Sequence, residues 1–369
     1  MPDSGPTELK AKFRVGLAAN LDTHQRDIGE ADLARLSAVA EFAFLEFNES
    51  SSWDEPPPHD PEAERRLIDF AAGLDALIVC HGAPRVTPVV MDAAPRLRFI
   101  GELEGDRFAQ RIDVEAASER KMRSIDTTQG SSYPVAEWAL AMMLIGLRNA
   151  GSVFRGLINH ERVFESDERY DDPGFLRGEL TGKTVGMIGA GHIGRRLLDL
   201  LQPFHTTVLV HDPYVPREIA DIYDVTLTTL DNVLSVSDVV VCLAPITPAT
   251  RGMIGEREIG LLRSGAVFVN VSRGAIVDSD ALIARLRRGD IIAGLDVFEP
   301  EPIPVDSPIR DLENAFITPH IAGVTAANNN RFFTLMVDEL LRFFAGHETR
   351  YDLLPQTLAN RRGEPPPVR

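Results

Sequence analysis

The segment that decides the fold is Thr184–Leu198, TVGMIGAGHIGRRLL. It begins with apolar residues typical of a buried strand and ends in an amphipathic run typical of a helix. Gly189, Gly191 and Gly194 stand between them as G-x-G-x-x-G. In this context the first glycine permits a tight turn, the second lets the backbone approach a pyrophosphate, and the third lets helix and strand pack closely. The N-terminus of the helix, with its N–H groups and positive dipole end, stabilises an anion.

An acidic residue follows at the position that selects the cofactor. The next predicted strand, TTVLVHD, ends in Asp212, which lies 23 residues after Gly189. A carboxylate there accepts hydrogen bonds from the ribose hydroxyls and repels a 2′-phosphate, so the sequence predicts NAD rather than NADP. The alternative is a structural turn with a surface aspartate. The order of strand, glycines, helix and acid favours the dinucleotide site.

The same alternation of strands and helices extends in both directions from this segment, which predicts doubly wound parallel sheets. Before it, strands are expected at Phe13–Ala18, Ala43–Phe47, Ala76–Cys80, Leu97–Ile100 and Met122–Ile125, with helices at Ala31–Val39, Glu62–Ala71, Val89–Ala94 and Val114–Lys121. A long apolar helix is expected from Tyr133 to Leu147, buried against another domain or subunit. After the segment, strands are expected at Val208–His211, Val239–Leu243, Ala266–Asn270, Ile291–Leu295 and Ala315–Ile317, and a last helix at Ala326–Phe344.

Composition limits the classes of partner. The chain has 369 residues, enough for two domains, and 38 Lys and Arg against 55 Asp and Glu give a net charge of −17. This acidity argues against nucleic acid and against an anionic membrane surface as partners. Cys80 and Cys242 lie in apolar runs and are expected to be buried free thiols. The N-terminus has no apolar core of the secretory type, so a soluble, cytoplasmic protein is expected.

Three further blocks place polar residues after predicted strands: VNVSRGAIVD, IAGLDVFEPEP and ITPHIAG. The carboxyl ends of parallel strands form the edge where ligands bind. Arg273 can hold a carboxylate or a carbonyl oxygen, and His320 can carry a proton, with an acid to orient it. These are the groups that hydride transfer at a 2-hydroxy or 2-keto acid requires. The other histidines show no metal-ligand spacing, and no metal is predicted.

In the order GAGHIG, VSRG, DVFEPEP and TPHIAG, the sequence resembles the D-isomer-specific 2-hydroxyacid dehydrogenases, strongly from Pro134 to Gly323. The resemblance implies that Arg273 clamps the substrate, that His320 is the acid/base and that Glu301 is its partner acid, with Glu299 as the alternative. A carboxylate beside the imidazole favours its protonated form. The implied cofactor contacts, besides the three glycines and Asp212, are His192, Ile193, Thr250, Val271, Ser272, Asp296 and Gly323.

The resemblance also implies the organisation of the chain. A flavodoxin-like catalytic domain would comprise residues 1–130 and 323–369, with a disordered tail at 361–369, and a Rossmann NAD-binding domain residues 131–322. A homodimer is expected, with the apolar helix Val135–Leu147 as the contact. The expected activity is hydride transfer between NAD(H) and C2 of a 2-hydroxy or 2-keto acid. The alternative is an NAD(H)-sensing interaction protein, like the co-repressors of this fold, with little or no turnover.

One stretch departs from the family pattern. The loop that binds the substrate carboxylate through backbone N–H groups resembles G-x-D-N-I-D, whereas residues 101–113 here are GELEGDRFAQRID. Gly105 is the expected substrate-binding residue of this loop, and Glu104 places an acid where an anionic substrate is disfavoured. Arg107 is either a second positive contact, for a phosphorylated or dicarboxylic substrate, or a solvated surface residue. The insertion also leaves open a degenerate enzyme that no longer admits substrate.

Overall fold

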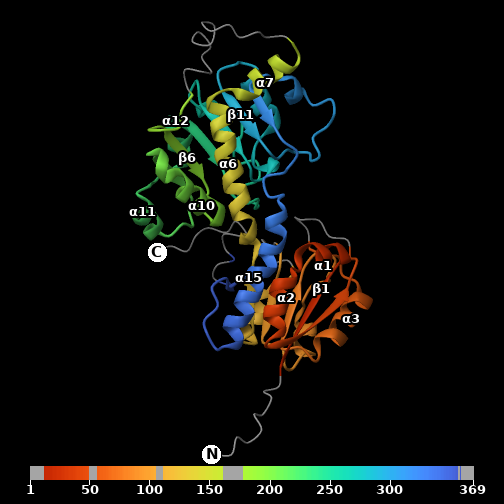
Figure 1. Ribbon diagram of the computed structural model, residues 1–369. Coiled ribbons are helices and arrows are strands. Elements are labelled where there is room, and N and C mark those ends of the chain that lie inside the picture. Colours follow the sequence, from red (N-terminus) through yellow and green to blue (C-terminus); the bar gives the residue numbers. More distant parts are fainter. Residues whose placement is uncertain (1–11, 50–55, 105–110, 161–177, 356–357, 359–369) are drawn as a thin grey trace, which may run out of the picture. The chain divides into compact units, whose positions relative to one another are not determined.

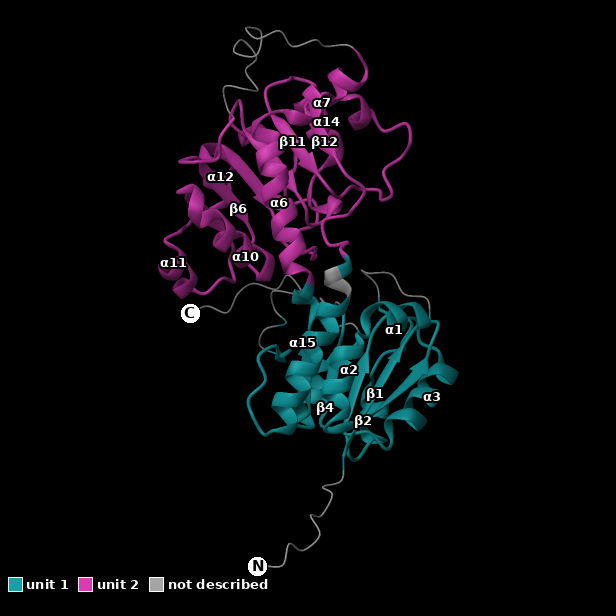
Figure 2. Cartoon of the chain, viewed as in Figure 1, with its two compact units in different colours: residues 1–130, 326–361 teal, residues 131–325, 362–369 magenta. Residues whose placement is uncertain are grey.

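The computed structural model describes residues 12–49, 56–104, 111–160, 178–355 and 358. They form two compact units, unit 1 within residues 1–130 and 326–361, and unit 2 within 131–325 (Figure 2). Residues 323–325, expected at the start of the returning catalytic segment, group here with unit 2. The backbone just before them is held in unit 2, where the N–H of Ala322 donates to Asp296. The expected tail at 361–369 lies outside the described residues.

Unit 1 is a parallel sheet wound on both sides (Figure 1). Its strand order is β2-β1-β3-β4-β5, and all four pairings are parallel. The strands are β1 Phe13–Ala19, β2 Ala40–Glu46, β3 Ala76–Val79, β4 Phe99–Glu102 and β5 Arg123–Asp126. The helices are α1 Leu21–Asp27, α2 Glu30–Ser37, α3 Pro61–Ala71, α4 Pro88–Asp92, α5 Val114–Glu119 and α15 Ala326–Phe344.

Each face of this sheet has its own apolar core. On one face, Leu67 of α3 and Val90 of α4 pack with Leu77 of β3. On the other, Phe333 of α15 and Leu36 of α2 pack with Val15 of β1. Figure 1 shows α15 beside α2, although almost 300 residues of sequence separate the two helices. The C-terminal helix therefore completes the N-terminal domain.

Unit 2 contains a seven-stranded parallel sheet in the order β12-β11-β10-β9-β6-β7-β8. Its strands are β6 Thr184–Ile188, β7 Thr207–His211, β8 Thr226–Leu227, β9 Val239–Cys242, β10 Val267–Asn270, β11 Ile292–Leu295 and β12 Ala315–Ile317. Its helices are α6 Ser132–Leu147, α7 Ala150–Ile158, α10 His192–Leu201, α11 Arg217–Tyr223, α12 Leu230–Val236, α13 Glu256–Leu261 and α14 Ser279–Leu286. Single 3₁₀ turns lie at Thr128–Ser131, Gln202–Phe204, Gly274–Ile276 and Pro308–Asp311. The direction of winding reverses between β6 and β9, so the predicted Rossmann topology is confirmed.

The apolar helix α6 is buried by its own domain. Ala136, Ala139, Met142 and Met143 are fully buried, and the helix packs on α10, β10 and β11. The expectation that another domain or subunit covers it is therefore wrong for most of its surface. A helix that is apolar all round needs cover on several sides, and here the sheet and α10 supply it.

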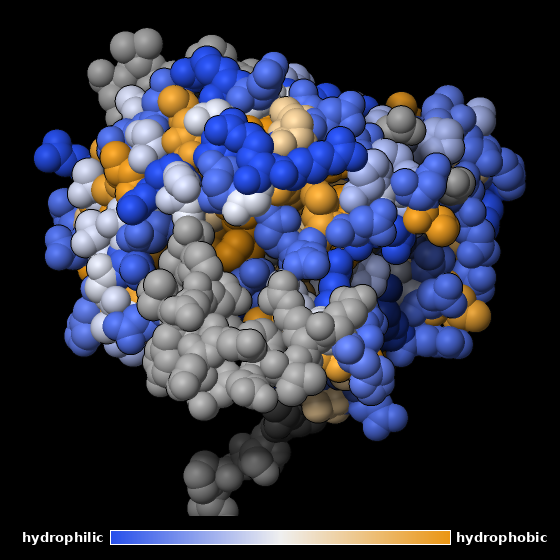
Figure 3. All heavy atoms as spheres, turned by 90° about the horizontal axis from the view of Figure 1, so that it is seen from above, coloured by the Kyte–Doolittle hydropathy of each residue, from blue (hydrophilic) through white to orange (hydrophobic). Residues whose placement is uncertain are grey.

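The surface is largely hydrophilic. On the face seen in Figure 3, hydrophilic residues predominate and apolar residues lie between them in small groups. Cys80 and Cys242 are buried and free, as predicted. Within the described part of the chain, no helix is long and apolar enough to cross a membrane.

Candidate functional site

The glycine loop lies at the carboxyl end of β6, where the winding of the unit 2 sheet reverses. Gly189 has a φ of 96°, and a Cβ there would lie 2.8 Å from the backbone N of Ala244. A Cβ at Gly194 would lie 2.9 Å from the carbonyl oxygen of Gly189, so strand and helix approach closely. A Cβ at Gly191 would meet no atom within 4 Å, so the backbone is open on this side, as the close approach of a pyrophosphate requires. These three positions have the geometry that dinucleotide binding requires.

Helix α10 begins at His192 with Gly191 as its N-cap, and Gly191 has no side chain to cap the first turn. Ile193, in the first turn of α10, packs its side chain against the unit 2 core, so only its backbone can face a ligand at the loop. Asp212 follows β7, and its two carboxylate oxygens accept from the N–H groups of Ala190 and Tyr214, each at 2.8 Å. A carboxylate has about four acceptor positions, so capacity remains for ribose hydroxyls.

The loops after β9 and β10 are fixed by their own polar side chains. The hydroxyl of Thr250 donates to the carbonyl of Pro245 at 2.6 Å and closes the turn after β9. Ser272 donates to the carbonyl of Ala244, which joins the β10 loop to the β9 loop. Val271 is buried in the apolar core of unit 2. The predicted cofactor-contacting positions therefore lie on two adjoining, rigid loops at the carboxyl edge.

Arg273 stands at the end of the β10 loop. Its guanidinium donates to the carbonyl of Ser272 at 2.7 Å, and its own carbonyl accepts from the side chain of Asn270 at 3.0 Å. The next residue must be glycine. A Cβ at Gly274 would lie 1.9 Å from the carbonyl carbon of Phe298, so no larger residue fits. The glycine of the VSRG motif is thus explained by packing against the β11 loop.

Asp296, at the end of β11, is fully buried and holds the loop that carries His320. Its carboxylate accepts from the backbone N–H groups of Ile321 at 2.9 Å and Ala322 at 2.8 Å, and also from the hydroxyl of Thr318. The backbone carbonyl of Asp296 accepts from His320 N at 2.8 Å. Its predicted contact with the nicotinamide carboxamide remains a prediction. Gly323 follows this loop, and a Cβ there would be 3.7 Å from Val135.

His320 and Glu301 form the acid–imidazole pair of the site. The Nδ1 of His320 lies 2.6 Å from Oε1 of Glu301, and the two side chains are 42% and 35% exposed. His320 has a φ of 55°, a left-handed conformation that residues other than glycine rarely adopt. Backbone strain of this kind is concentrated at functional sites. Because β12, β11 and β10 are neighbours, His320, Glu301 and Arg273 follow three adjacent strands at one edge.

Unit 1 contains a polar group that the sequence does not predict. Cys80, His81 and Glu104 offer possible metal-ligand atoms within 4.8 Å of one another. They come from the ends of β3 and β4, 23 residues apart, so no local spacing reveals them. The predicted substrate residue Gly105, and Arg107, lie outside the described residues.

Known proteins match this chain in sequence and in fold. Residues 141–322 match the model of the D-isomer specific 2-hydroxyacid dehydrogenase NAD binding domain. A D-3-phosphoglycerate dehydrogenase of Methanocaldococcus jannaschii is 32% identical over 285 residues, which are 77% of this chain and 52% of that one. The chain thus spans about half the length of that relative.

Two further proteins match over most of both chains. A glyoxylate reductase of Aeropyrum pernix is 31% identical over 324 residues, 84% of this chain and 89% of its own. The solved structure of a phosphoglycerate oxidoreductase from Rhizobium etli covers 92% of this chain with a TM-score of 0.77 at 22% identity, a likeness of fold. Unit 2 is accordingly an NAD-binding domain. On this sequence match and this architecture, the chain belongs to the D-isomer-specific 2-hydroxyacid dehydrogenase family.

Proposed function

We propose that the protein is an NAD-dependent oxidoreductase that interconverts a 2-keto acid and the corresponding 2-hydroxy acid. The observation that carries the proposal is the 2.6 Å pair of His320 and Glu301, on the loops that follow the strands next to β10 and its Arg273. When bound, NADH supplies the hydride that adds to C2 of the keto acid. The residues of the chain must then bind the acid, polarise its carbonyl and provide a proton.

Each of these tasks has a candidate group. Glu301 engages Nδ1 of His320, so Nε2 is the nitrogen that carries the transferred proton to the carbonyl oxygen. The Glu301 carboxylate fixes the orientation of the imidazole through Nδ1, and protonated His320 is the proton donor in keto-acid reduction. Arg273 binds the substrate carboxylate and polarises the carbonyl through charge-assisted hydrogen bonds. In the oxidising direction, neutral His320 accepts the hydroxyl proton.

The proposal is tested by measuring NADH consumption by the purified protein with each member of a panel of 2-keto acids. Parallel reactions contain NADPH in place of NADH. We expect turnover of about 1–10³ s⁻¹ with at least one keto acid, which is the common range for enzymes. Tight NADH binding without turnover on any member of the panel would contradict the proposal. That outcome would favour an NAD(H)-sensing interaction protein on the same fold.

The cofactor preference gives a second prediction. Asp212→Asn keeps an oxygen that can accept from Ala190 N but removes the charge that repels a 2′-phosphate. Without the repulsion between the carboxylate and the 2′-phosphate, we expect the ratio of kcat/KM for NADPH to that for NADH to rise by about tenfold or more. A tenfold rise corresponds to about 1.4 kcal/mol. Asp224→Asn, at the exposed C-cap of α11, is the matched control. An unchanged ratio in Asp212→Asn would refute the role of the carboxylate.

We also propose a homodimer, formed through α7 and the outer side of α6. Phe154, Leu157 and Ile158 of α7 lie at helical spacing on one face and are 62%, 49% and 56% exposed. Leu144 of α6 is 36% exposed. Exposed apolar side chains on one helix face are typical of a subunit contact.

A further inference from the structure

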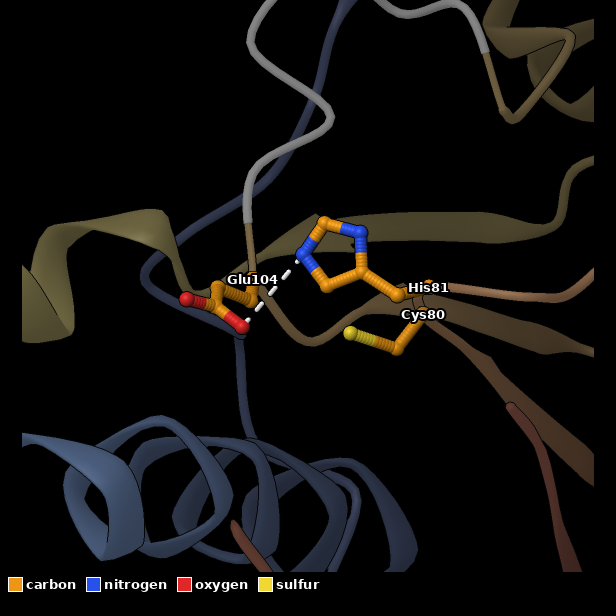
Figure 4. A group of neighbouring side chains, drawn as sticks. All are labelled: Cys80, His81 and Glu104. Atoms are coloured by element: carbon orange, nitrogen blue, oxygen red, sulfur yellow. Dashed lines mark ion pairs between the residues drawn. The ribbon is translucent and has the colours of Figure 1, made fainter. Parts of the chain in front are cut away.

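The polar group of Cys80, His81 and Glu104 has a charged partner within unit 1. Nε2 of His81 lies 3.4 Å from Oε2 of Glu104, the pair that is dashed in Figure 4, and the same oxygen accepts from the Arg26 guanidinium at 2.6 Å. A metal ion bound to this oxygen would have to displace that guanidinium. Burial also raises the pKa of the Cys80 thiol well above its ordinary value, so the sulfur stays protonated. These residues are better explained as a paired cluster than as a ligand site.

A different polar side chain of unit 1 is buried without a partner. Ser124, the second residue of β5, is 4% exposed, and its hydroxyl forms no hydrogen bond with any of the described residues. Native proteins leave few buried hydroxyls unpaired, because each one costs free energy, and ligand sites are among the places where they occur.

The direction of the Ser124 side chain follows from the alternation of side chains along β5. Its neighbour Ile125 packs in the core on the α15 face of the sheet, so Ser124 points to the opposite face. Ile100, which pairs with Ser124 from β4, packs in the core of that opposite face together with Val114 of α5 and Leu353. A cavity of about 270 Å³ lies on this side, and Ser124 lines it with Val114 and Leu353. The unpaired hydroxyl therefore faces the cavity.

The lining of the cavity is mostly apolar, with a cation beside it. Val114, Met122, Leu353 and Leu354 contribute apolar side chains, and Lys121 is an exposed lysine. Within the described ranges of the chain, no carboxylate forms an ion pair with Lys121. A cavity of this kind suits a small organic anion, because its hydrocarbon part would meet the apolar residues and its charge would meet the lysine.

The other charges at the cavity are already paired. The guanidinium of Arg123 donates to the carboxylate of Asp352 at 3.2 Å and to that of Glu348 at 2.9 Å. Asp352 also accepts from the hydroxyl of Thr349 at 2.8 Å. The carboxylate that lines the cavity is thus neutralised by its own arginine, and Lys121 is left as the positive charge available to a ligand.

The backbone at Lys121 supports a role for its side chain. Lys121 follows the C-cap of α5 with a φ of 57°, a left-handed conformation in which glycine is favoured. Its N–H donates to the carbonyl of Ser118 at 3.0 Å, and the N–H of Met122 donates to that of Ala117 at 2.9 Å, the two bonds of a Schellman motif. Glycine would close this turn with less strain, so the turn itself does not explain a lysine here.

We propose that this cavity binds a small carboxylate that carries a hydroxyl or carbonyl group at its other end. The carboxylate pairs with the Lys121 ammonium, the hydrocarbon part lies along Val114 and Leu353, and the second polar group bonds to the Ser124 hydroxyl. Ser124 lies near the amino end of β5, whereas open parallel sheets bind their principal ligand at the carboxyl ends of the strands. None of the residues proposed for catalysis is among the described residues that line the cavity, so it is a second ligand site.

The test measures the binding of γ-hydroxybutyrate to the purified full chain by isothermal titration calorimetry. Butyrate, which lacks the hydroxyl, and butanediol, which lacks the carboxylate, are the matched probes. We expect the affinity for γ-hydroxybutyrate to exceed that for either of the others by about threefold or more, the scale of one hydrogen bond or one exposed ion pair. Arg273→Met should leave this affinity unchanged, which separates the cavity from the proposed substrate site.

Two variants test the two polar contacts. Ser124→Ala should abolish the preference for γ-hydroxybutyrate over butyrate without lowering the melting temperature of the free protein, since its hydroxyl has no partner to lose. Lys121→Gly should weaken the binding of both carboxylates by about threefold, while the melting temperature stays the same or rises, because glycine suits the positive φ. Lys12→Gly is the matched control, because Lys12 is an exposed lysine of unit 1 outside the cavity.

The outcomes separate a ligand site from a structural role. Binding of none of the three probes would overturn the inference, as would an affinity that either cavity variant leaves unchanged. Loss of binding in Arg273→Met would assign the probes to the proposed substrate site and would overturn it too. If affinity and melting temperature fell together in both variants, Ser124 and Lys121 would act through the fold rather than on a ligand.

Discussion

His320→Asn is expected to lower kcat for keto-acid reduction by about 10²–10⁴-fold, the usual contribution of a positioned general acid. Asparagine is the informative replacement because His320 has a φ of 55°, and asparagine adopts left-handed backbone more readily than most residues. The loop should therefore keep its hydrogen bonds to Asp296 while the proton donor is lost. Stopped-flow measurement of NADH oxidation gives the rate, and fluorescence titration gives the affinity for NADH, which should stay nearly constant.

The chain contains a matched control for this experiment. His205 is also an exposed histidine with a positive φ, 50°, but it lies before β7, at the amino edge of the same sheet. His205→Asn should leave kcat close to that of the unmodified protein. Should His320→Asn retain kcat within about threefold, the assignment of the acid would be wrong, since general acid catalysis contributes far more than that.

The glycine loop shows what local sequence can predict. Its context of strand, turn and helix fixes the backbone. In the structure a Cβ at Gly189 or Gly194 would clash with neighbouring backbone, whereas Gly191 faces open space. Most strands of the two sheets are also recognisable, because buried parallel strands are short apolar runs. The two-residue strand β8, Thr226–Leu227, is exposed and was not predicted. Element ends were less accurate: β2 begins at Ala40, three residues before the predicted start.

Elements without apolar periodicity escaped prediction. Helix α1, LDTHQRD, contains a single strongly apolar residue and is fixed instead by its Asn20 cap and by contact with α15. It carries Arg26, whose partner Glu104 is 78 residues away in sequence. No local pattern encodes a pairing of that kind. The positive φ of His320 is likewise imposed from outside, by the hydrogen bonds of its loop to Asp296.

Arg111→Leu is expected to destabilise the protein by about 3–5 kcal/mol, the cost of leaving one member of a buried ion pair without its partner. The Nε of Arg111 lies 3.3 Å from Oε2 of Glu102, and the two side chains are 9% and 1% exposed. The guanidinium also donates to the carbonyl of Ala83 at 3.0 Å. Without Arg111, the Glu102 carboxylate stays buried in a medium that solvates charge poorly and loses its ion-pair partner. The urea concentration at the midpoint of unfolding should therefore fall steeply.

The double variant Arg111→Leu/Glu102→Leu separates charge from packing. Replacing both charges removes the unpaired carboxylate, so most of the lost stability should return, as happens where buried pairs are exchanged for apolar residues. The exposed pair of Arg14 and Glu41, with side chains 55% and 68% exposed, is the control, and Arg14→Leu should change the midpoint little. A double variant no more stable than Arg111→Leu would mean that Arg111 acts through its bond to the carbonyl of Ala83, in the loop after β3. In that case the arginine acts through this hydrogen bond rather than through the ion pair.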